Sequence, residues 1–335
     1  MELRSISREQ EDNMGDTKIE WADKTWNPLI GEKGFYHCVK ISEGCKNCYA
    51  ERIAVQQGGR PFRVGADRLV LNDKQLEAPL RWKKPQRIFV CSMTDLFLAM
   101  PGYIEKIWDI MLQCPQHTFM ILTKRLIDIA WWYVDKVEWA PNIWLGTSVE
   151  NQARATERIP ILLRYPAARL FVSLEPLLGP IDLTAGSGCL GDYIGPDGEV
   201  IANPIDGLRG LDWVITGGET GQHARPAHPR WFRQIRDACI DHGTPFFFKH
   251  WGEWAPGGIQ TDMLSQLLKK DTSSIPADTA INFGKFAVFG DGQVMDRVGR
   301  YKSGNVLDGA IHQEYPNGTR RNDPHDSGDN PLLGI

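Results

Sequence analysis

Short runs of consecutive apolar residues recur through the middle of the chain, and each run ends in small or polar residues. Unbroken apolar runs of this length are typical of strands in a parallel sheet that is covered on both faces. An extended segment, residues 17–30, precedes the runs and is the presumed first strand. The runs lie within residues 87–95, 117–124, 142–151, 169–175, 211–219 and 244–249.

Segments with helical character stand between most of these runs. They include Tyr49–Val55, Gly102–Leu112, Gln152–Leu163 and Pro229–His242. An alternation of strand and helix predicts βαβ units, in which the helices cover a parallel sheet. The sequence therefore predicts an α/β protein with a partial, TIM-like (β/α)6 barrel of about six parallel strands, open on one side.

The barrel is expected to occupy residues 17–254, after a polar, mobile leader at 1–16. A stretch rich in Gly, Pro and Asp, residues 184–210, interrupts it and is either a lid, a partner surface or a tolerated surface insertion. Residues 255–316 form an extension that closes part of the opening, with a helix at 263–270 and a hairpin at 282–298. The polar tail, 317–335, is expected to be disordered.

Composition narrows the class of protein. The chain has 335 residues, 42% of them hydrophobic, and a net charge of −4, so bulk charge does not indicate nucleic-acid binding. Seven unevenly spaced cysteines do not form a disulfide framework, which favours a reducing cytoplasm. No secretory signal and no apolar run long enough to cross a bilayer is recognisable, so no membrane partner is expected.

Polar residues follow the predicted strands at the point where each strand ends. In parallel α/β proteins the carboxyl ends of the strands carry the ligand site. The alternative for any one of them is a helix cap, or an ion pair with a barrel Arg or Lys. The set comprises Ser92, Asp95, Thr123, Lys124, Ser148, Glu150, Asn151, Ser173, Glu175, Glu219 and Lys249.

One short loop carries the most specific chemistry. Cys38, Cys45 and Cys48 lie within eleven residues, with the spacing C-x6-C-x2-C, and Gly44 permits a tight bend before the second thiol. Three thiolates leave one iron of a [4Fe–4S] cluster open to a substrate or cofactor. Two alternatives remain: a zinc site completed by His37, Cys91 or another residue, and three cysteines without metal.

Seven short motifs together resemble a phage- and prophage-associated family, the three-cysteine-motif proteins, whose activity is unassigned. That family is similar in turn to radical S-adenosylmethionine (radical SAM) enzymes. The resemblance extends from about Thr17 to Pro316. The motifs are Trp26-Asn-Pro-Leu-Ile-Gly31, Gly44-Cys-Lys-Asn-Cys-Tyr-Ala-Glu51, Ser92-Met-Thr-Asp-Leu-Phe97, Gly146-Thr-Ser-Val-Glu-Asn151, Ser173-Leu-Glu-Pro-Leu-Leu-Gly-Pro-Ile181, Gly217-Gly-Glu-Thr-Gly221 and Phe248-Lys-His-Trp-Gly-Glu-Trp254.

The resemblance implies a radical-SAM type of barrel with a [4Fe–4S] cluster and S-adenosylmethionine (SAM) as cofactors. One-electron reduction would cleave SAM to methionine and a 5′-deoxyadenosyl radical, which abstracts a substrate hydrogen. An electron donor is then a required partner. The substrate is unknown, and the phage association suggests a nucleic acid or nucleotide.

The resemblance also implies roles for the polar residues. Cys38, Cys45 and Cys48 would ligate iron. Ser92 and Asp95, which occupy the place of the Gly-Gly-Glu element common in radical SAM enzymes, would bind the SAM amine. Lys124 would meet its carboxylate, and Ser148, Glu150 and Asn151 its ribose. Glu175, Glu219, Arg225 and Lys249 would face the substrate.

Three classes of function therefore stay open. The first is the radical SAM enzyme, and the second is a zinc- or cluster-stabilised, non-catalytic binding protein of phage origin that acts through a protein partner. The third, a metal-dependent hydrolase, is disfavoured because no histidine pair has the spacing of metal ligands; His223 and His228 are the nearest approach.

Overall fold

The computed structural model describes residues 15–63, 68–127, 137–184, 193–194, 200–201, 208, 210–257 and 275–316. Most of the predicted leader, the tail from residue 317 and the helix at 263–270 lie outside the described residues. Of the stretch 184–210 only a few residues are described, including the short antiparallel pair β8 (Tyr193–Ile194) and β9 (Val200–Ile201).

The main sheet has seven strands and is curled into a half-barrel, as a partial barrel requires. Its order is β1-β4-β5-β6-β7-β10-β11. All six predicted apolar runs form strands in it. The strands are β1 (Lys24–Trp26), β4 (Arg87–Val90), β5 (Thr118–Thr123), β6 (Ile143–Ser148), β7 (Arg169–Leu174), β10 (Trp213–Gly217) and β11 (Phe246–His250).

The extended segment at 17–30, the presumed first strand, contributes β1, so the sheet has seven strands where about six were expected. This strand pairs in parallel with β4, with Lys24 opposite Ile88 and Trp26 opposite Val90. Its three residues are too few to show an apolar run, and its partner follows some sixty residues later. The pairing is therefore set by tertiary contacts and not by local pattern.

The four predicted helices are present with nearly the expected bounds. They are α2 (Tyr49–Gln56), α5 (Pro101–Leu112), α7 (Gln152–Leu162) and α8 (Pro229–His242). Shorter elements are the 3-10 turns η1 (Glu43–Cys45) and η2 (Leu96–Leu98), and the helices α3 (Asp73–Leu76), α4 (Ala78–Arg81) and α10 (Arg300–Ser303). Asn151 caps α7 and His228 caps α8 through their side chains, which fixes where both helices begin.

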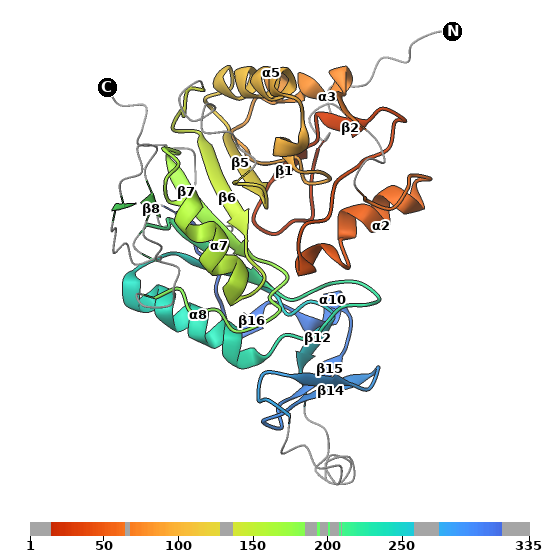
Figure 1. Ribbon diagram of the computed structural model, residues 1–335, viewed down its shortest axis with the longest axis vertical. Coiled ribbons are helices and arrows are strands. Elements are labelled where there is room, and N and C mark those ends of the chain that lie inside the picture. The colour runs from red at the N-terminus through yellow and green to blue at the C-terminus, as the bar shows by residue number, and fades with distance from the viewer. Residues whose placement is uncertain are drawn as a thin grey trace. The chain divides into compact units, whose positions relative to one another are not determined.

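The described residues fall into two compact units. The first comprises the residues up to Thr147 together with Arg164–Phe171, and the second comprises Ser148–Leu163 together with the residues from Val172 onward. In the first unit α5 packs along the sheet that contains β1, β4 and β5 (Figure 1). A separate two-stranded antiparallel sheet in the same unit pairs β2 (Leu29–Gly31) with β3 (Leu69–Leu71).

Tryptophans fill the interior of the first unit. The Trp21 ring lies 4.8 Å from the ring of Phe89 and the Trp26 ring 5.7 Å from that of Phe119, measured between centroids. Both tryptophans are fully buried and belong to the core of this unit. The Trp26 indole also donates a hydrogen bond to the carbonyl oxygen of Gln75, at 2.7 Å, and so ties α3 to the sheet.

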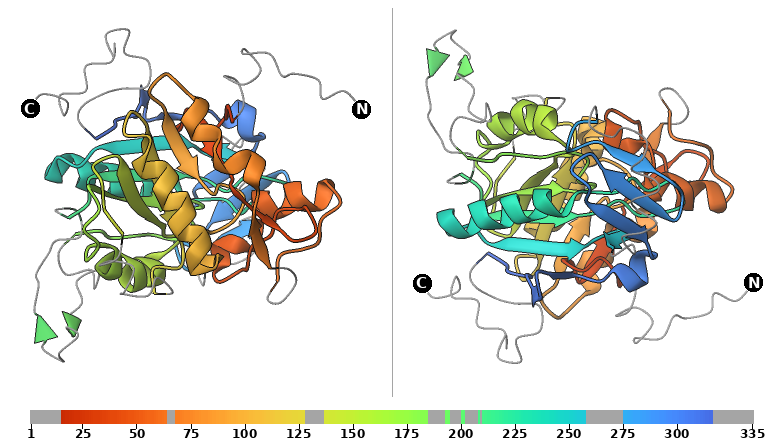
Figure 2. Two further views of the ribbon diagram at one scale, coloured as in Figure 1. Left: turned by 90° about the horizontal axis from the view of Figure 1, so that it is seen from above. Right: turned by 90° about the horizontal axis from the view of Figure 1, so that it is seen from below.

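The second unit contains the extension. Four antiparallel strands follow in the order β12 (Trp254–Pro256), β15 (Val294–Arg297), β14 (Phe286–Phe289) and β13 (Ala280–Asn282). The predicted hairpin with its turn at Gly290–Gly292 is thus confirmed, as the β14–β15 pair. Figure 2 shows one end of α8 next to the blue strands of the extension, where His228 packs against Phe289 of β14.

The last described segment covers the edge strand of the sheet. It follows the hairpin of β16 (Val306–Leu307) and β17 (Ala310–Ile311). The Phe248 N–H donates to His312 O at 2.7 Å, and the Glu314 N–H donates to Phe246 O at 3.2 Å. These bonds occupy the backbone groups that β11 would otherwise expose, and so protect the edge from pairing with other chains.

The extension is joined to α8 through a buried histidine. His228 Nδ1 accepts a hydrogen bond from the Arg230 N–H at 3.0 Å, so the proton of the neutral ring resides on Nε2, which donates to Asp291 Oδ2 at 2.9 Å. The ring packs edge-on against Phe289. Asp278 accepts from both the Trp231 indole and Arg230, at 2.7 Å each. Burial lowers the pKa of His228, although Asp291 opposes the shift.

We expect this join to weaken at mildly acidic pH. A histidine whose folded-state pKa lies below its unfolded value of about 6.5 contributes stability that is complete above pH 6.5 and declines as the pH falls toward the folded-state pKa. Asn in the place of His228 keeps a cap acceptor but does not titrate. Urea unfolding between pH 7 and pH 5 should therefore show a shallower loss of stability for His228→Asn than for the wild type. Equal slopes would contradict the assignment.

Candidate functional site

The three cysteines of the predicted site lie on one loop between β2 and α2. Cys38 is in its extended part, Cys45 ends η1, and Cys48 is the residue that caps the start of α2. Each side chain is partly buried and each thiol is reduced. The predicted strand–loop–helix setting is therefore confirmed.

One side of the loop packs on a small apolar cluster. Cys38 and Cys48 contact the cluster formed by Ala50, Ala54, Phe62 and Met93. Two of its members come from α2, one from the segment after that helix and one from the turn after β4. The cluster excludes water from one side of both thiols, as a site for an oxygen- or water-sensitive group requires.

Polar bonds anchor the loop to the carboxyl ends of β4 and β5. The Thr94 hydroxyl donates to His37 O at 2.6 Å, and Arg125 Nη2 donates to Val39 O at 3.0 Å. From the other end of the loop, the Tyr49 hydroxyl donates to Ser92 O at 2.5 Å. The cysteine loop is thus fixed at both ends to the strand ends that the sequence singled out.

Sequence reasoning missed these anchoring side chains. Thr94, Arg125 and Tyr49 each stand next to a residue that the pattern had selected, but nothing in their own type indicates a contact with a distant loop. A further anchor was also missed: Asn27 Oδ1 accepts from the Met93 N–H at 3.1 Å and from the Ser92 hydroxyl at 3.2 Å. The signal available was only that Asn27 belongs to the Trp26–Gly31 motif.

Asp95 joins the turn after β4 to the turn after β5. Its carboxylate accepts from the Thr123 hydroxyl at 2.8 and 3.0 Å, from the Lys124 N–H at 3.1 Å and from the Phe97 N–H at 3.1 Å. Burial raises the pKa of Asp95, and these hydrogen bonds oppose the rise. Both carboxylate oxygens are therefore engaged in positioning the turns, and a role for Asp95 with the SAM amine stays a prediction.

The electrostatics of the loop disfavour a bare thiolate. Burial raises the pKa of Cys38 to about 12, with Asp95, Cys48 and Cys45 contributing to the rise as neighbouring negative charges. Cys91, fully buried directly after β4 with a backbone φ of 58°, has its pKa raised by burial and then by Asp95 and Cys38. A positively charged metal group would offset this repulsion, since a coordinating thiol is deprotonated.

The three thiols of the loop are the candidate ligands of a metal group. Among the described residues, no three His, Cys, Asp or Glu side chains converge on one point where a metal ion could sit. A mononuclear zinc site needs such convergence. A cubane also needs its thiolates gathered around it, although each ligates a different iron. The three thiols match the number and type of protein ligands that leave one iron open, and the cluster stays a prediction.

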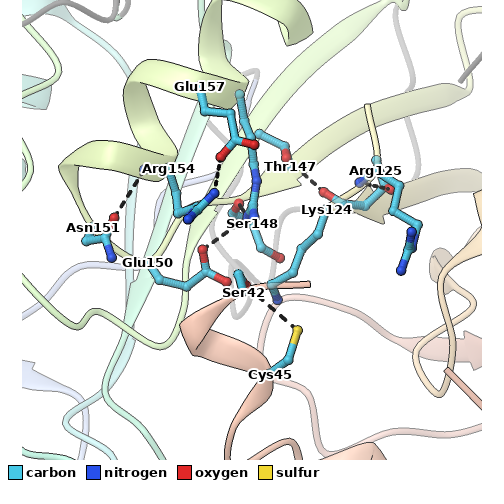
Figure 3. A network of polar contacts seen from close by, with 12 residues as sticks. Ser42, Cys45, Lys124, Arg125, Thr147, Ser148, Glu150, Asn151, Arg154 and Glu157 are labelled. Atoms are coloured by element: carbon cyan, nitrogen blue, oxygen red, sulfur yellow. Dashed lines mark hydrogen bonds and ion pairs between the residues drawn. The ribbon is translucent and has the colours of Figure 1, made fainter. Parts of the chain in front are cut away.

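Lys124 is the cation directed at this loop. It follows β5 directly, and its side chain extends from the strand end toward Ser42 and Cys45 (Figure 3). The Ser42 hydroxyl lies 3.7 Å from the Cys45 sulfur. A lysine in this position can meet an anionic group bound at the thiols.

Ser148, Glu150 and Asn151 make contacts of the structural kind. Arg158 donates to Ser148 O at 2.7 Å and to Glu150 Oε2 at 3.0 Å, and this ion pair is completely buried. Asn151 Oδ1 accepts from the Arg154 N–H at 3.1 Å and caps α7, while Arg154 also pairs with Glu157 (Figure 3). Glu150 is thus the partner in an ion pair, and Asn151 is a helix cap, which are the alternative roles named for these positions. Ribose binding stays a prediction.

Glu175 and Lys249 form an ion pair at the ends of β7 and β11. Lys249 Nζ lies 3.3 Å from Glu175 Oε1, and the Ser173 hydroxyl donates to Glu175 Oε2 at 3.1 Å. The β10–β11 register shifts so that Lys249 is an extra residue between Phe248 and His250. Such a bulge re-aims a side chain, and bulges are enriched next to active sites. Both side chains keep some exposure, about 15%.

Glu219 is held by Arg225. Its Oε2 accepts from the Arg225 N–H at 2.7 Å and from Nε at 2.8 Å, and its Oε1 accepts from Nη2. Bidentate contacts of this kind are strong and directional. The pair closes the loop 219–225, so the two predicted substrate-facing residues bind each other.

Two buried polar side chains near these strand ends were not selected by the sequence analysis. Thr216 Oγ1 and His250 Nδ1 lack a hydrogen-bond partner among the described residues. Burial lowers the pKa of His250 well below its usual range, and the nearby Lys249 and Arg300 lower it further, so the ring is neutral. In the sequence, Thr216 and His250 stand within apolar strand segments, and nothing there distinguishes them from core residues.

Two adjacent glycines explain why Glu175 can lie where it does. A Cβ on Gly217 would stand 2.3 Å from Glu175 Oε1, and a Cβ on Gly218 would stand 1.9 Å from the backbone oxygen of Trp251. The first obstacle is the end of a flexible side chain, and the second is the main chain of Trp251, whose N–H donates to Gly304 O at 3.2 Å.

We therefore expect unequal costs from matched substitutions. Gly217→Ala should lower the free energy of unfolding by about 1 kcal/mol, since Glu175 can move, whereas Gly218→Ala should cost more than about 3 kcal/mol, since the backbone must shift. Urea unfolding monitored by tryptophan fluorescence gives both values. Equal effects, or the reverse order, would show that the two strand ends are not packed in this way.

No helix in the described parts of the chain is long and apolar enough to cross a membrane. Comparison with curated proteins and with solved structures gave no match. One family model, described as "Protein of unknown function (DUF5131)", matches residues 16–316, and the chain therefore belongs to this family.

Proposed function

We propose that Cys38, Cys45 and Cys48 hold a [4Fe–4S] cluster and that SAM binds at its open iron, as in a radical SAM enzyme. The observation that carries the proposal is the loop itself. Three partly buried thiols lie on one segment that Thr94, Arg125 and Tyr49 bond to the ends of two adjacent parallel strands. The carboxyl ends of parallel strands are where α/β proteins bind cofactors.

When bound, the two cofactors would supply one-electron reductive cleavage of SAM. The chain's own residues bind, orient and shield. The apolar cluster around Phe62 and Met93 keeps water from the thiols, and Asp95 fixes the relative position of the turns after β4 and β5. Lys124 supplies a positive charge for a carboxylate, and Ser92 is held ready by Asn27.

The substrate-side roles fall to Glu175 and Lys249. This pair is only partly buried, it sits beside a bulge, and its carboxylate accepts from Ser173. An amine and a carboxylate in contact can accept a proton from a bound substrate or donate one to it. Glu219 instead positions its loop through Arg225. These residues do not identify the substrate.

A non-catalytic, cluster- or zinc-stabilised binding protein is the second candidate. One observation favours it: Asp95, Glu150 and Glu219, three carboxylates expected at the site, are engaged in hydrogen bonds or ion pairs within the protein. Structural ion pairs of this kind are common in proteins without catalysis. The two candidates differ in whether the loaded protein binds and cleaves SAM.

The first test concerns the metal. Anaerobically purified or reconstituted protein should be brown and contain four irons per chain, as a cubane requires. Cys38→Ala, Cys45→Ala and Cys48→Ala should each lose the colour and most of the iron. Cys114→Ala is the matched control and should keep both, because Cys114 is buried between α5 and β5. Iron analysis with electron paramagnetic resonance gives the result, and a colourless protein with one zinc per chain would refute the cluster.

The second test concerns SAM. With dithionite, the loaded wild type should release 5′-deoxyadenosine and methionine, and calorimetry should detect SAM binding. Lys124→Met should weaken SAM binding about tenfold, the order of one charge-assisted hydrogen bond, with the iron content unchanged. Lys106→Met, on the exposed side of α5, should leave the affinity unchanged. A fully loaded cluster that neither binds nor cleaves SAM would decide for the binding protein.

A further inference from the structure

Positive charge is concentrated around the cysteine loop. Six Lys or Arg and only three Asp or Glu stand between Glu32 and Arg63, a net charge of +3. The whole chain has 38 basic and 42 acidic residues, a net charge of −4, so the remainder carries −7. A local positive surface on an acidic protein attracts anions to that surface alone.

The charges surround the outer face of α2. Tyr49, Arg52, Val55 and Gln56 lie on this face and are exposed, whereas Ala50 and Ala54 on the opposite face are buried. The segment after the helix folds back on it, because Phe62 packs against Ala50 and Ala54 and its N–H donates to Glu51 Oε1 at 2.9 Å. Arg60 and Arg63 therefore flank the same helix.

Most of these cations are not neutralised by an acid. Lys40 pairs with Glu51 at 2.6 Å. Lys46, Arg52, Arg60 and Arg63 are exposed and form no ion pair with any other described residue. Four solvated cations within one small module leave its charge available to a ligand.

An exposed aromatic ring lies among them. The Tyr49 side chain is 38% exposed, yet its hydroxyl is held by Ser92 O at 2.5 Å, so the ring is anchored at its far end. Arg52 follows Tyr49 by one helical turn on the same face. Lys46 precedes Tyr49 by three residues, just before the helix begins. A fixed ring between cations is the arrangement that stacks an unpaired base while the phosphates meet the charges.

We propose that Lys46, Tyr49 and Arg52, with Arg60 and Arg63 on the segment that flanks the helix, bind single-stranded nucleic acid. The anchored ring favours this ligand over an acidic protein, which would use the charges but gain little from one aromatic side chain. It also favours a single strand over a duplex, whose bases are already stacked on one another. The site needs neither the cluster nor SAM, so its test stands apart from that of the proposed function.

Fluorescence anisotropy tests the proposal on the full chain as purified. The labelled ligands are 20-nucleotide dT and rU strands, a DNA duplex of equal length and poly-glutamate. Binding to one or both single strands, tighter than to the duplex and weakening with salt, is expected, and the dT and rU arms separate DNA from RNA. Absence of binding at 50 mM salt, or equal binding to poly-glutamate, would overturn it.

Variants locate the site. Lys46→Gln with Arg52→Gln should reduce the slope of log affinity against log salt by about 1.4, or about 0.7 for each phosphate that is no longer neutralised. Lys83→Gln with Lys84→Gln changes the net charge equally on exposed residues before β4 and should leave the slope unchanged. If both double variants behave alike, binding is a property of net charge and the proposal fails.

The ring is tested separately. Tyr49→Ser should weaken binding roughly 5- to 100-fold, the range expected when one base stack is removed, whereas Tyr49→Phe keeps the ring but loses its bond to Ser92 O and should weaken binding less than Tyr49→Ser does. Circular dichroism and thermal unfolding identify a variant that has lost its fold. A folded Tyr49→Ser protein with wild-type affinity, or a Tyr49→Phe protein as weak as Tyr49→Ser, would refute the stacking role.

Discussion

The hydrogen bonds that join the cysteine loop to the ends of β4 and β5 are the constraint on which the candidate metal site depends. The loop of eleven residues with three thiols contains one 3-10 turn, η1, which is too short to fix the whole loop, so the rest of its shape must come from outside. Thr94, Arg125 and Tyr49 supply it, and Asp95 fixes the two turns from which the first two residues project. The apolar cluster below the loop then shields thiols that are already in place.

The polar strand ends divide into two groups with different physical roles. Buried, fully hydrogen-bonded carboxylates such as Glu150 with Arg158 are costly to disturb, because removal of one partner leaves an uncompensated charge. Glu175 with Lys249 is only partly buried, and its lysine stands at a bulge. A pair of this second kind can respond to a ligand, whereas a pair of the first kind maintains the fold. Position at a strand end is therefore not sufficient for a catalytic role.

The same loop and the helix that follows it carry two separable properties. The inner side presents thiols and an apolar cluster, and the outer side of α2 presents cations and an anchored ring. Helical periodicity makes this division, because residues 50 and 54 face inward while residues 49, 52 and 56 face out. A metal group and a polyanion would thus contact opposite faces of one small module, and the sequence of eight helical residues encodes both.

The sequence alone determined the strands, the helices and the cysteine loop. Unbroken apolar runs, helical spacing and the close placement of Cys38, Cys45 and Cys48 are local patterns. Such patterns can be recognised from the order of residues alone. They indicated the sheet strands, including the extended segment that holds β1, and the four long helices in the described parts of the chain. They did not indicate which strand β1 pairs with, because a partner some sixty positions away leaves no periodic signal.

What the tertiary structure decided was which polar groups meet. Whether Glu150 pairs or binds a ligand depends on Arg158, which α7 brings within 3.0 Å of it. Whether the Tyr49 ring is mobile or fixed depends on the carbonyl oxygen of Ser92, 43 residues away. A hydrogen bond requires its partners within about 3 Å and in line, and only the folded chain sets such distances between residues far apart in sequence.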